Sequence, residues 1–501
     1  MELQGKRILI FQQRDWGRRI GHFLAKKLQS EGARLAALTF KNESHQFVLA
    51  QKDVRYDLII SNDAVMADPF KFLGGDKISL EEICADLGVA SVWPFIYSLR
   101  NHVKNYGEKY FYSFRQNVPD EEIVAYAKAA YKYLKRFFDE FRPEVILAPN
   151  YADITHIMCN LMARKRGAVM LVPVDCKVRG ISVFSRSFHD DQSRFCARVD
   201  ELNAGAAKSG NRERARQYIA EFRQRFKNPK YAEQLLRKKS PWKTLRHNLS
   251  PLRKILRWYT RRQTNYVPSL GATIDYKPPR IILRDFFANR RYKKFAQNFP
   301  YHPLEKLGKF IYFPLQFQPE ATIDVQAPYF SNQLETARLV AMSLPGDYTL
   351  AVKEHPAMVG HRSPSYLDKF ARTANVTLID HRISSGEVFK QADLIVSPSS
   401  TSIAEAAFYN KPAIQLGDLG TTLKLPNVFK HSDMPTLPQK IKEVLKIDLQ
   451  TPDYERRLEN YVAAAYDTGF DFDYFGVWYH GEKEDLEKLW QIYRRGILNE
   501  L

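Results

Sequence analysis

Cysteine is scarce in this sequence of 501 residues, which contains four in total. None of them forms a CxxC pair, and all lie in the first 200 residues: Cys84, Cys159, Cys176 and Cys196. A zinc cluster or a disulfide scaffold is therefore not expected, and a reducing compartment is favoured. The sequence also lacks any run of about 18 apolar residues, so nothing in it predicts a membrane-spanning helix.

The amino-terminal residues do not have the pattern of a secretory leader. The short apolar stretch 8–11 is followed at once by Arg14 and Asp15, so no apolar core of a signal peptide can form there. We therefore expect a cytoplasmic protein, with peripheral attachment to the inner face of the inner membrane left open.

Acidic residues are in deficit, with Asp+Glu 56 against Lys+Arg 76 and a formal net charge of +20. The excess is concentrated between Arg212 and Arg262, where 17 basic residues face 3 acidic ones. Nucleic acid, an anionic membrane and a polyanionic substrate would all be attracted by such charge. No nucleic-acid-binding motif accompanies it, so we expect no nucleic acid partner.

Hydrophobic periodicity predicts alternating strands and helices in two separate regions. In the first region the predicted strands are 7–11, 34–39, 56–61, 145–148 and 168–174, and the predicted helices are 16–30, 120–141 and 153–165. In the second region the predicted strands are 309–314, 349–353, 376–379, 393–397 and 413–416, with helices over 329–343, 386–391, 402–409 and from Tyr366. Such alternation is typical of a parallel sheet covered by helices on both faces.

The predicted fold class is α/β, with two doubly wound, Rossmann-like domains facing a cleft. We expect an N-terminal α/β domain over 1–202 and a basic helical insertion over 203–302, in which 281–283 is the first stretch that could form a strand. A C-terminal α/β domain over 303–453 should follow. A helical tail over 454–501 is expected to pack back across the domains.

Two segments of the second region lie at predicted strand ends, where open α/β sheets bind ligands. In the first, Lys353 supplies a positive charge, and His355, followed by Pro356, can donate to a phosphate or a ribose. A histidine that only packs in the turn is the alternative. The second segment has hydroxyl groups at a helix start, an arrangement that suits phosphate: Ser399, Ser400, Thr401 and Ser402. An ordinary N-cap by Thr401 or Ser402 together with Glu405 is the alternative.

The runs LAVKEHPAMVGHR and LIVSPSSTSIAEAAFYNKPAIQLGD, with YFPLQFQPE at 312–320, resemble bacterial capsule and surface-polysaccharide biosynthesis glycosyltransferases, which include the Kdo transferases. The resemblance covers about a fifth of the chain. It implies a GT-B-like fold in which the domain over 1–202 is the acceptor side and the domain over 303–453 binds the nucleotide-sugar, with no metal and no cofactor required. It also implies that His355 and the four hydroxyl residues contact the nucleotide.

Other residues receive roles through the same resemblance. Gln318 and Glu320 would lie in the loop under the nucleotide, and Glu405 is a candidate for ribose binding or helix capping. Arg362 could neutralise the leaving phosphate, or it could be a solvated loop arginine. The implied partners are a nucleotide-sugar donor, with a CMP-Kdo-like sugar as first choice, and a lipid-linked capsule or lipopolysaccharide glycan as acceptor.

A catalytic carboxylate is expected in the first region, since transfer to a hydroxyl with inversion needs a base. Asp153 and Asp15 both follow predicted strands and are our candidates, although either could simply cap a helix. His156 and Asp63 are weaker candidates. The DxD at 471–473 is interpreted as unrelated to metal binding because it follows both predicted sheets, and 189–191 is interpreted as a surface loop.

The basic insertion contains apolar residues at helical spacing opposite basic ones. This pattern could place a helix on an anionic membrane, or the leucine stripe could pack on the sheet domain. The candidate membrane residues are Trp242, Leu249, Arg253, Lys254, Arg257 and Trp258. The alternatives to a glycosyltransferase are a nucleotide-sugar epimerase or glycerophosphotransferase of the same fold, and a non-catalytic protein that binds membranes or polyanions.

Overall fold

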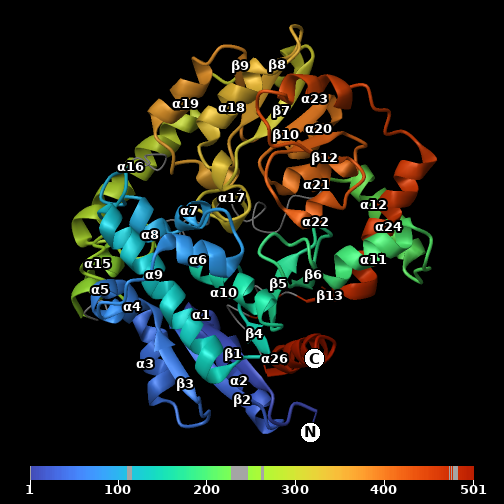
Figure 1. Ribbon diagram of the computed structural model, residues 1–501. Helices are drawn as coiled ribbons and strands as arrows, with labels where there is room; N and C mark the ends of the chain where they lie inside the picture. The colour runs from blue at the N-terminus through green and yellow to red at the C-terminus, as the bar shows by residue number, and fades with distance from the viewer. Residues whose placement is uncertain are drawn as a thin grey trace.

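Two parallel-rich sheets, one in each half of the chain, form the framework of the molecule (Figure 1). The computed structural model describes residues 2–109, 115–226, 246, 248–260, 265–472, 474, 477 and 483–501. Trp242 and Asp473 lie outside the described residues, so their predicted roles are not assessed. The predicted fold class is confirmed, with one doubly wound sheet in each half.

The N-terminal sheet has seven strands in the order β13-β6-β5-β4-β1-β2-β3. Its strands are β1 (Arg7–Gln13), β2 (Arg34–Phe40), β3 (Leu58–Ser61), β4 (Val145–Leu147), β5 (Val169–Asp175), β6 (Ile181–Ser185) and β13 (Phe470–Asp471). β1 is central and pairs in parallel with both β2 and β4, with Ile8 opposite Leu35 on one side and Val145 on the other. β6 and β13 extend the sheet in antiparallel fashion and were not predicted.

Helices cover both faces of this sheet. They are α1 (Arg14–Trp16), η1 (Gly17–Gly21), α2 (His22–Ser30), α3 (Asn42–Ala50), α4 (Asn62–Ala67), α5 (Pro69–Leu73), α6 (Leu80–Leu87), α7 (Trp93–Ile96), α8 (Arg100–Val103), α9 (Asp120–Arg136), η2 (Phe137–Phe141) and α10 (Ile154–Lys165). Gly17 is required where η1 crosses β1, because a Cβ atom there would lie 2.5 Å from the Gln12 backbone.

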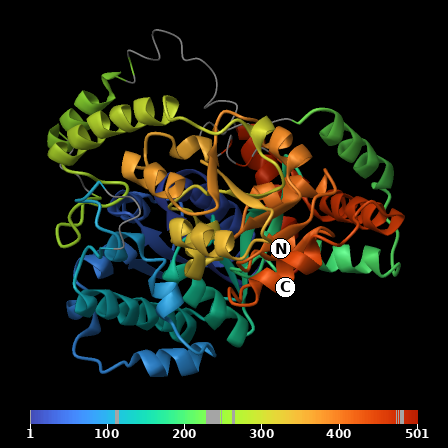
Figure 2. The same ribbon diagram turned by 90° about the horizontal axis from the view of Figure 1, so that it is seen from above.

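The middle of the chain is helical, as predicted, with α11 (Arg194–Asn203), α12 (Arg212–Gln224), α15 (Ser250–Thr260) and α16 (Pro279–Gln297). The possible strand at 281–283 is wrong, since these residues belong to α16, which has a proline in its first turn. A proline without an N–H fits that position, where the helix leaves its amides unpaired. In Figures 1 and 2, α15 and α16 run along one side of the molecule.

The C-terminal sheet has six parallel strands in the order β12-β11-β10-β7-β8-β9. They are β7 (Phe310–Pro314), β8 (Thr349–Lys353), β9 (Val376–Ile379), β10 (Leu394–Ser397), β11 (Ala413–Gln415) and β12 (Val428–Lys430). The strands β7, β8 and β10 are buried on both faces, and their near-continuous apolar sequences reflect this position. Chain order reverses between β7 and β10, which makes this the switch point of the sheet.

The helices of the C-terminal half are short. They are η3 (Leu304–Lys306), α17 (Ala321–Asp324), η4 (Pro328–Phe330), α18 (Gln333–Met342), η5 (Pro356–Met358), α19 (Pro364–Ala371), α20 (Ser385–Gln391), α21 (Thr401–Ala407), α22 (Gly420–Leu423) and α23 (Leu437–Val444). The tail adds α24 (Pro452–Thr468) and α26 (Lys483–Leu498). Among the described residues, no helix is long and apolar enough to cross a bilayer.

The tail reaches both the middle helices and the N-terminal sheet. α24 packs against α11 and α12, and α26 packs against α2. Asp471 of the DxD belongs to β13, which is a strand of the N-terminal sheet. Our expectation that the motif comes after both sheets is therefore wrong for Asp471. The domain boundaries at 202, 302 and 453 stay predictions.

Candidate functional site

The ends of β7 and β10 are joined at the switch point of the C-terminal sheet. Gln316, just after β7, donates from Nε2 to the Ser397 hydroxyl at the end of β10 over 2.9 Å. Arg362 donates to the Gln316 carbonyl oxygen over 2.7 Å and so connects the loop after β8 to the same point. The three loops that contain the predicted donor-site residues therefore meet at one edge of the sheet.

His355 follows β8 in this cluster, and its hydrogen bonding defines its tautomer. Its Nδ1 atom accepts from the Ala357 amide over 3.1 Å. Burial, and then the charges of Arg362 and Lys353, lower the pKa of His355 to about 4. The ring is therefore neutral at pH 7, and its proton is on Nε2. A neutral imidazole of this tautomer is a hydrogen-bond donor for a phosphate or ribose oxygen.

Arg362 is buried and is not the solvated loop arginine of the alternative interpretation. Its guanidinium contacts the Glu354 carboxylate at 2.5 Å, and both side chains are almost completely buried. Burial raises the pKa of Glu354, and the charge of Arg362 opposes that effect. The pair holds the loop after β8 in place. The role of Arg362 at a leaving phosphate stays a prediction.

The hydroxyl segment after β10 has two members with structural roles. Ser400 is the N-cap of α21, since its Oγ accepts from the Ser402 amide over 3.0 Å. The cap expected at Thr401 or Ser402 is therefore wrong by one or two residues. Ser399 is buried and donates to the Thr322 carbonyl oxygen. This bond ties the segment to α17.

The loop after β7 has one fixed glutamine and one exposed glutamate. Gln318 is buried, donates to the Ser331 carbonyl oxygen and accepts from Gln333, each over 2.8 Å. Glu320 is exposed and accepts from the Thr322 hydroxyl over 3.1 Å.

Lys353 and Glu405 belong to a second buried cluster. Lys353 donates to the Ile383 carbonyl oxygen over 3.0 Å and to the Ser385 hydroxyl over 2.9 Å. Glu405 accepts from Arg179, a residue of the N-terminal half, over 3.4 Å. Burial raises the pKa of Glu405 to about 7 and lowers that of Lys353 to about 8, and each residue opposes the shift of the other. Glu405 thus connects the halves and does not cap α21.

The corresponding edge of the N-terminal sheet contains Asp153, which follows β4. Its Oδ1 accepts from the Thr155 amide and lies 3.0 Å from Nδ1 of the buried His156. The other ring nitrogen of His156 lies 3.1 Å from the Gln13 side-chain oxygen, at the end of β1. Burial alone would raise the pKa of Asp153, but His156, the Thr155 amide and Arg100 together lower it.

Asp153 and Asp15 are both near the ends of central strands, yet their surroundings differ. The carboxylate of Asp15 is exposed and forms an ion pair with Arg18 on the same helical turn. Asp153 lies at the switch point of its sheet, between the ends of β4 and β1, and has a buried partner. Asp153 is therefore the better placed of the two predicted carboxylates to act on a bound ligand.

Arg100 connects the candidate residues of the two halves. Its Nε donates over 2.8 Å to Asp324, a buried residue of α17. The same guanidinium acts on the pKa of Asp153 in the N-terminal half and on that of Glu320 in the C-terminal half. The predicted base and the loop after β7 therefore approach the same cation.

Sequence reasoning missed Arg100 and Arg179 because neither lies in a recognisable motif. Their significance comes from partners more than 220 residues away. The surface-loop interpretation of 189–191 is wrong for Asp190, which is buried against the C-terminal half. Asp190 accepts from Gln326 over 2.7 Å, and the Gly420 amide donates to the His189 carbonyl oxygen over 2.6 Å.

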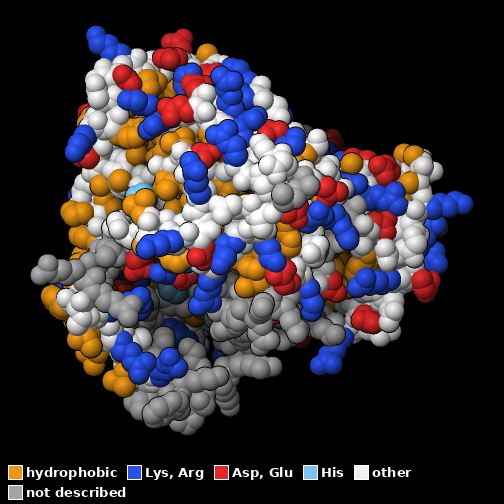
Figure 3. Space-filling model, turned by 90° about the horizontal axis from the view of Figure 1, so that it is seen from below, with side chains coloured by type: hydrophobic (Ala, Val, Ile, Leu, Met, Phe, Trp, Pro, Cys, Tyr) orange, Lys and Arg blue, Asp and Glu red, His pale blue; other side chains and the backbone are white. Residues whose placement is uncertain are grey.

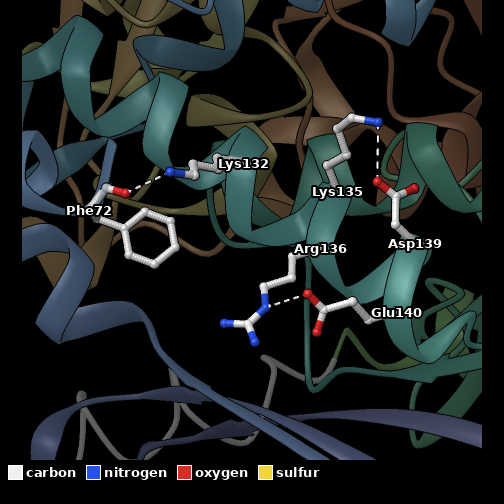
Figure 4. A pocket seen from close by; sticks show the side chains of 6 residues that line it. All are labelled: Phe72, Lys132, Lys135, Arg136, Asp139 and Glu140. Carbon is white, nitrogen blue, oxygen red and sulfur yellow. Dashed lines mark hydrogen bonds and ion pairs between the residues drawn. The ribbon is translucent and has the colours of Figure 1, made fainter. Parts of the chain in front are cut away.

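A surface pocket is lined mainly by residues of α9 and η2 (Figure 4). Its lining residues are Phe72, Lys132, Lys135, Arg136, Asp139 and Glu140. The charged ones are already paired, with Lys135 at 3.1 Å from Asp139 and Arg136 at 2.8 Å from Glu140. The charged side chains that line the pocket therefore already have partners, and we assign the pocket no function.

The part of the leucine stripe that the structure describes, from Leu249 to Tyr259, does not pack on a sheet. Leu249, Leu252, Leu256 and Tyr259 are 41%, 61%, 64% and 69% exposed. Arg253, Lys254 and Arg257 are exposed on the same helix, whereas Trp258 is half-buried and stacks edge-on against Tyr266. In Figure 3, hydrophobic side chains gather along the side where Figure 1 places α15, beside lysine and arginine side chains.

No protein-family model matches the sequence, and none of the curated proteins matches it. Among solved structures, the chain is similar to the KpsC beta Kdo 2,7 transferase of Thermosulfurimonas dismutans, with 14% identity, a TM-score of 0.34, and coverage of 67% of this chain and 80% of that chain. It is also similar to the UDP-GlcNAc 2-epimerase of Neisseria meningitidis bound to UDP-GlcNAc, with 11% identity, a TM-score of 0.25, and coverage of 92% and 97%. The fold assignment rests on the two doubly wound sheets themselves.

Proposed function

We propose that the chain is a glycosyltransferase that moves a sugar from a nucleotide-activated donor to a lipid-linked capsule or lipopolysaccharide glycan. A CMP-Kdo-like sugar is the first donor to test, and no metal is invoked. One observation carries the proposal: His355, whose Nδ1 accepts from the Ala357 amide, lies in the loop after β8. Arg362 and Gln316 connect that loop to Ser397 at the end of β10, where the hydroxyl segment begins. This is the position at which open α/β sheets bind ligands.

The proposed reaction uses one group from each half. The acceptor hydroxyl loses its proton to Asp153 as its oxygen bonds to the anomeric carbon of the donor sugar. The bond between that carbon and the phosphate oxygen breaks, and the electron pair leaves with the nucleotide. The Nε2–H of His355 donates to a phosphate oxygen and so stabilises the charge that develops there. Glu354 and Arg362 hold the loop of His355 in position.

The test is calorimetric titration of the protein with CMP, CDP, UDP and GDP, performed on the wild type and on His355→Ala. We expect one base to bind best and His355→Ala to weaken its binding roughly 10-fold or more. His302→Ala is the matched control, since His302 is exposed in the same half and its ring lies 2.9 Å from the carbonyl oxygen of the next residue, Pro303. Equal nucleotide affinity of wild type and His355→Ala would contradict the assignment of the site.

A nucleotide-sugar epimerase and a glycerophosphotransferase remain the alternatives with the same fold. An epimerase needs no acceptor, so a new sugar nucleotide formed from the donor alone would identify it. A glycerophosphotransferase would use CDP-glycerol, so release of CMP from that donor would favour it. Binding of lipid or polyanion with no affinity for any nucleotide would favour the non-catalytic alternative.

We also propose that α15 attaches the enzyme to an anionic membrane, where a lipid-linked acceptor would be found. The exposed leucine face and the exposed arginines and lysine of α15 support this proposal. The test is co-sedimentation with vesicles of phosphatidylglycerol or phosphatidylcholine. Leu252→Asp with Leu256→Asp should weaken binding to the anionic vesicles roughly 10-fold. Met342→Asp, at an equally exposed position on α18, should not weaken it.

A further inference from the structure

Three carboxylates near the boundary of the two halves are each in contact with more than one cation. Asp324 faces Arg100 and Lys104, at 2.8 and 3.4 Å. Asp275 faces Arg14 and Lys41, at 2.5 and 3.8 Å. A single ion pair needs one cation for each carboxylate, so these groups contain more positive charge than pairing requires.

The third carboxylate, Asp285 on α16, has three cations around it. Lys277 lies at 2.6 Å, Arg284 at 2.8 Å and Lys109 at 3.9 Å. Taken together, seven cations surround three carboxylates, which leaves four positive charges without a matching carboxylate within these groups. We call these seven residues the cationic row: Arg14, Lys41, Arg100, Lys104, Lys109, Lys277 and Arg284.

Tyr106 shows that the three groups are neighbours. Arg284 donates to its carbonyl oxygen over 3.2 Å, and the Lys277 ammonium lies 5.9 Å from the centre of its ring. Burial raises the pKa of its hydroxyl, and the carboxylates of Asp324 and Asp275 raise it further. Within the described ranges this hydroxyl is buried and has no hydrogen-bond partner. An unpaired donor therefore lies where the three groups converge.

The cationic row connects the two predicted sites. At one end, Lys109 and Lys277 act on His361, whose pKa is lowered by desolvation and by these two charges. His361 is the neighbour of Arg362, which belongs to the donor-site loop. At the other end, Arg14 follows β1, and the charge of Arg100 helps to lower the pKa of Asp153. A ligand extending from Asp153 toward the donor site would lie along these cations.

We propose that the cationic row binds an acceptor that has at least two negative charges, either carboxylates of an acidic glycan or phosphates of a phosphorylated one. The seven side chains are 10% to 49% exposed, so an anion can reach them. Cations that are held together against their mutual repulsion attract a polyanion, and such binding weakens as salt concentration rises. This inference rests on the proposed function, because it names the acceptor of the same reaction.

The test is calorimetric titration with three named probes at low and high salt. The probes are oligogalacturonate for carboxylates, tripolyphosphate for phosphates, and maltopentaose as the neutral control. We expect at least one anionic probe to bind, its affinity to fall with salt, and maltopentaose not to bind. The anionic probe that binds more tightly identifies the source of the charge.

Variants distinguish binding from a purely structural role. Lys277→Gln and Lys104→Gln should each weaken binding of the anionic probe about 5-fold to 10-fold and make it less sensitive to salt. Lys277→Arg should restore most of the affinity. Lys309→Gln is the matched control, because Lys309 also pairs with an aspartate, at 2.9 Å, but on an exposed surface of the C-terminal half.

Two results would overturn the inference. One is the absence of binding by either anionic probe; the other is a lower melting temperature in both lysine-to-glutamine variants with unchanged affinity. Nucleotide titration of the same samples separates this inference from the proposed function. Nucleotide binding without anion binding contradicts only the cationic row as an acceptor site, whereas anion binding without nucleotide binding contradicts the glycosyltransferase.

Discussion

In the C-terminal sheet chain order reverses between β7 and β10, and in the N-terminal sheet it reverses between β1 and β4. The two edges share a topology but differ in chemistry. The C-terminal edge has a neutral histidine, hydroxyl groups and one buried ion pair, between Arg362 and Glu354. The N-terminal edge has a carboxylate, and the cationic row begins beside it with Arg14 and Arg100. This difference suggests two separate tasks. The C-terminal edge is suited to hold a charged leaving group by hydrogen bonds, and the N-terminal edge to attract and activate an acidic acceptor.

The largest expected effect is on the N-terminal edge. Asp153→Asn should reduce turnover about 10²-fold to 10⁴-fold, because an amide cannot accept the acceptor proton. Asparagine caps a helix as well as aspartate does, so α10 should stay folded. Nucleotide affinity should not change, since the nucleotide is assigned to the other edge. Turnover and nucleotide titration on the same preparation check both statements.

Asp68→Asn is the matched control for Asp153→Asn. Asp68 caps α5 through the Lys71 amide, at 2.9 Å, and lies on the surface. Turnover by this variant should equal that of the wild type. If Asp153→Asn retained full activity, the base would have to be sought elsewhere, and the separation of tasks between the two edges would fail.

The next effect concerns the buried ion pair of the C-terminal edge, between Arg362 and Glu354. Arg362→Met should lower the free energy of unfolding by about 3–5 kcal/mol, because it leaves the Glu354 carboxylate buried without its partner. Arg338→Met breaks an exposed pair with Glu335 and should cost less than about 1 kcal/mol. Urea denaturation measures both. An equal decrease in the free energy of unfolding in the two variants would mean that water reaches the pair at the C-terminal edge.

The smallest effect concerns Asp190, which joins the two halves. Burial raises the pKa of Asp190 to about 6, above the value of about 4 expected in the unfolded chain. The folded protein therefore binds a proton more tightly, and the contribution of Asp190 to stability is lost as pH rises from about 4 to 6. Asp190→Asn stays neutral, so its stability relative to the wild type should increase over that window by about 2 kcal/mol.

Thermal or urea unfolding at a series of pH values checks this expectation. Asp200→Asn provides the comparison, since Asp200 is exposed on α11 and pairs with Lys424. The stability difference from the wild type should change more with pH for Asp190→Asn than for Asp200→Asn. A stability difference for Asp190→Asn that does not change with pH would show that this carboxyl is already ionised in the folded protein.

Much of the fold could be predicted because local patterns determine it. The strands at 349–353 and 376–379 were predicted with their observed bounds, since each is a buried apolar run between turn signals. β6 and β13 could not be found in this way. They pair with each other across nearly 290 residues, and β13 has only two residues. Such pairing depends on tertiary contacts that no local pattern records.

In the candidate site, too, some parts could be predicted from local patterns and others depend on tertiary contacts. The loops after β7, β8 and β10 were predicted because they follow strands and contain polar residues at a sheet edge. Glu405 was expected near a ribose or at a helix cap, but it lies against Arg179 of the other half. The cationic row was not visible in the sequence, because its members are spread from Arg14 to Arg284 and only the fold brings them together.

The most direct test of the central claim is the imidazole ¹⁵N spectrum of His355, in protein labelled with ¹⁵N-histidine. At pH 7 we predict a neutral ring with its proton on Nε2, and a change of the Nε2 resonance when the preferred nucleotide is added. The resonances of His302 should not change. A charged His355 at pH 7, or a His355 resonance that no nucleotide alters, would contradict the assignment of the C-terminal edge as the nucleotide site.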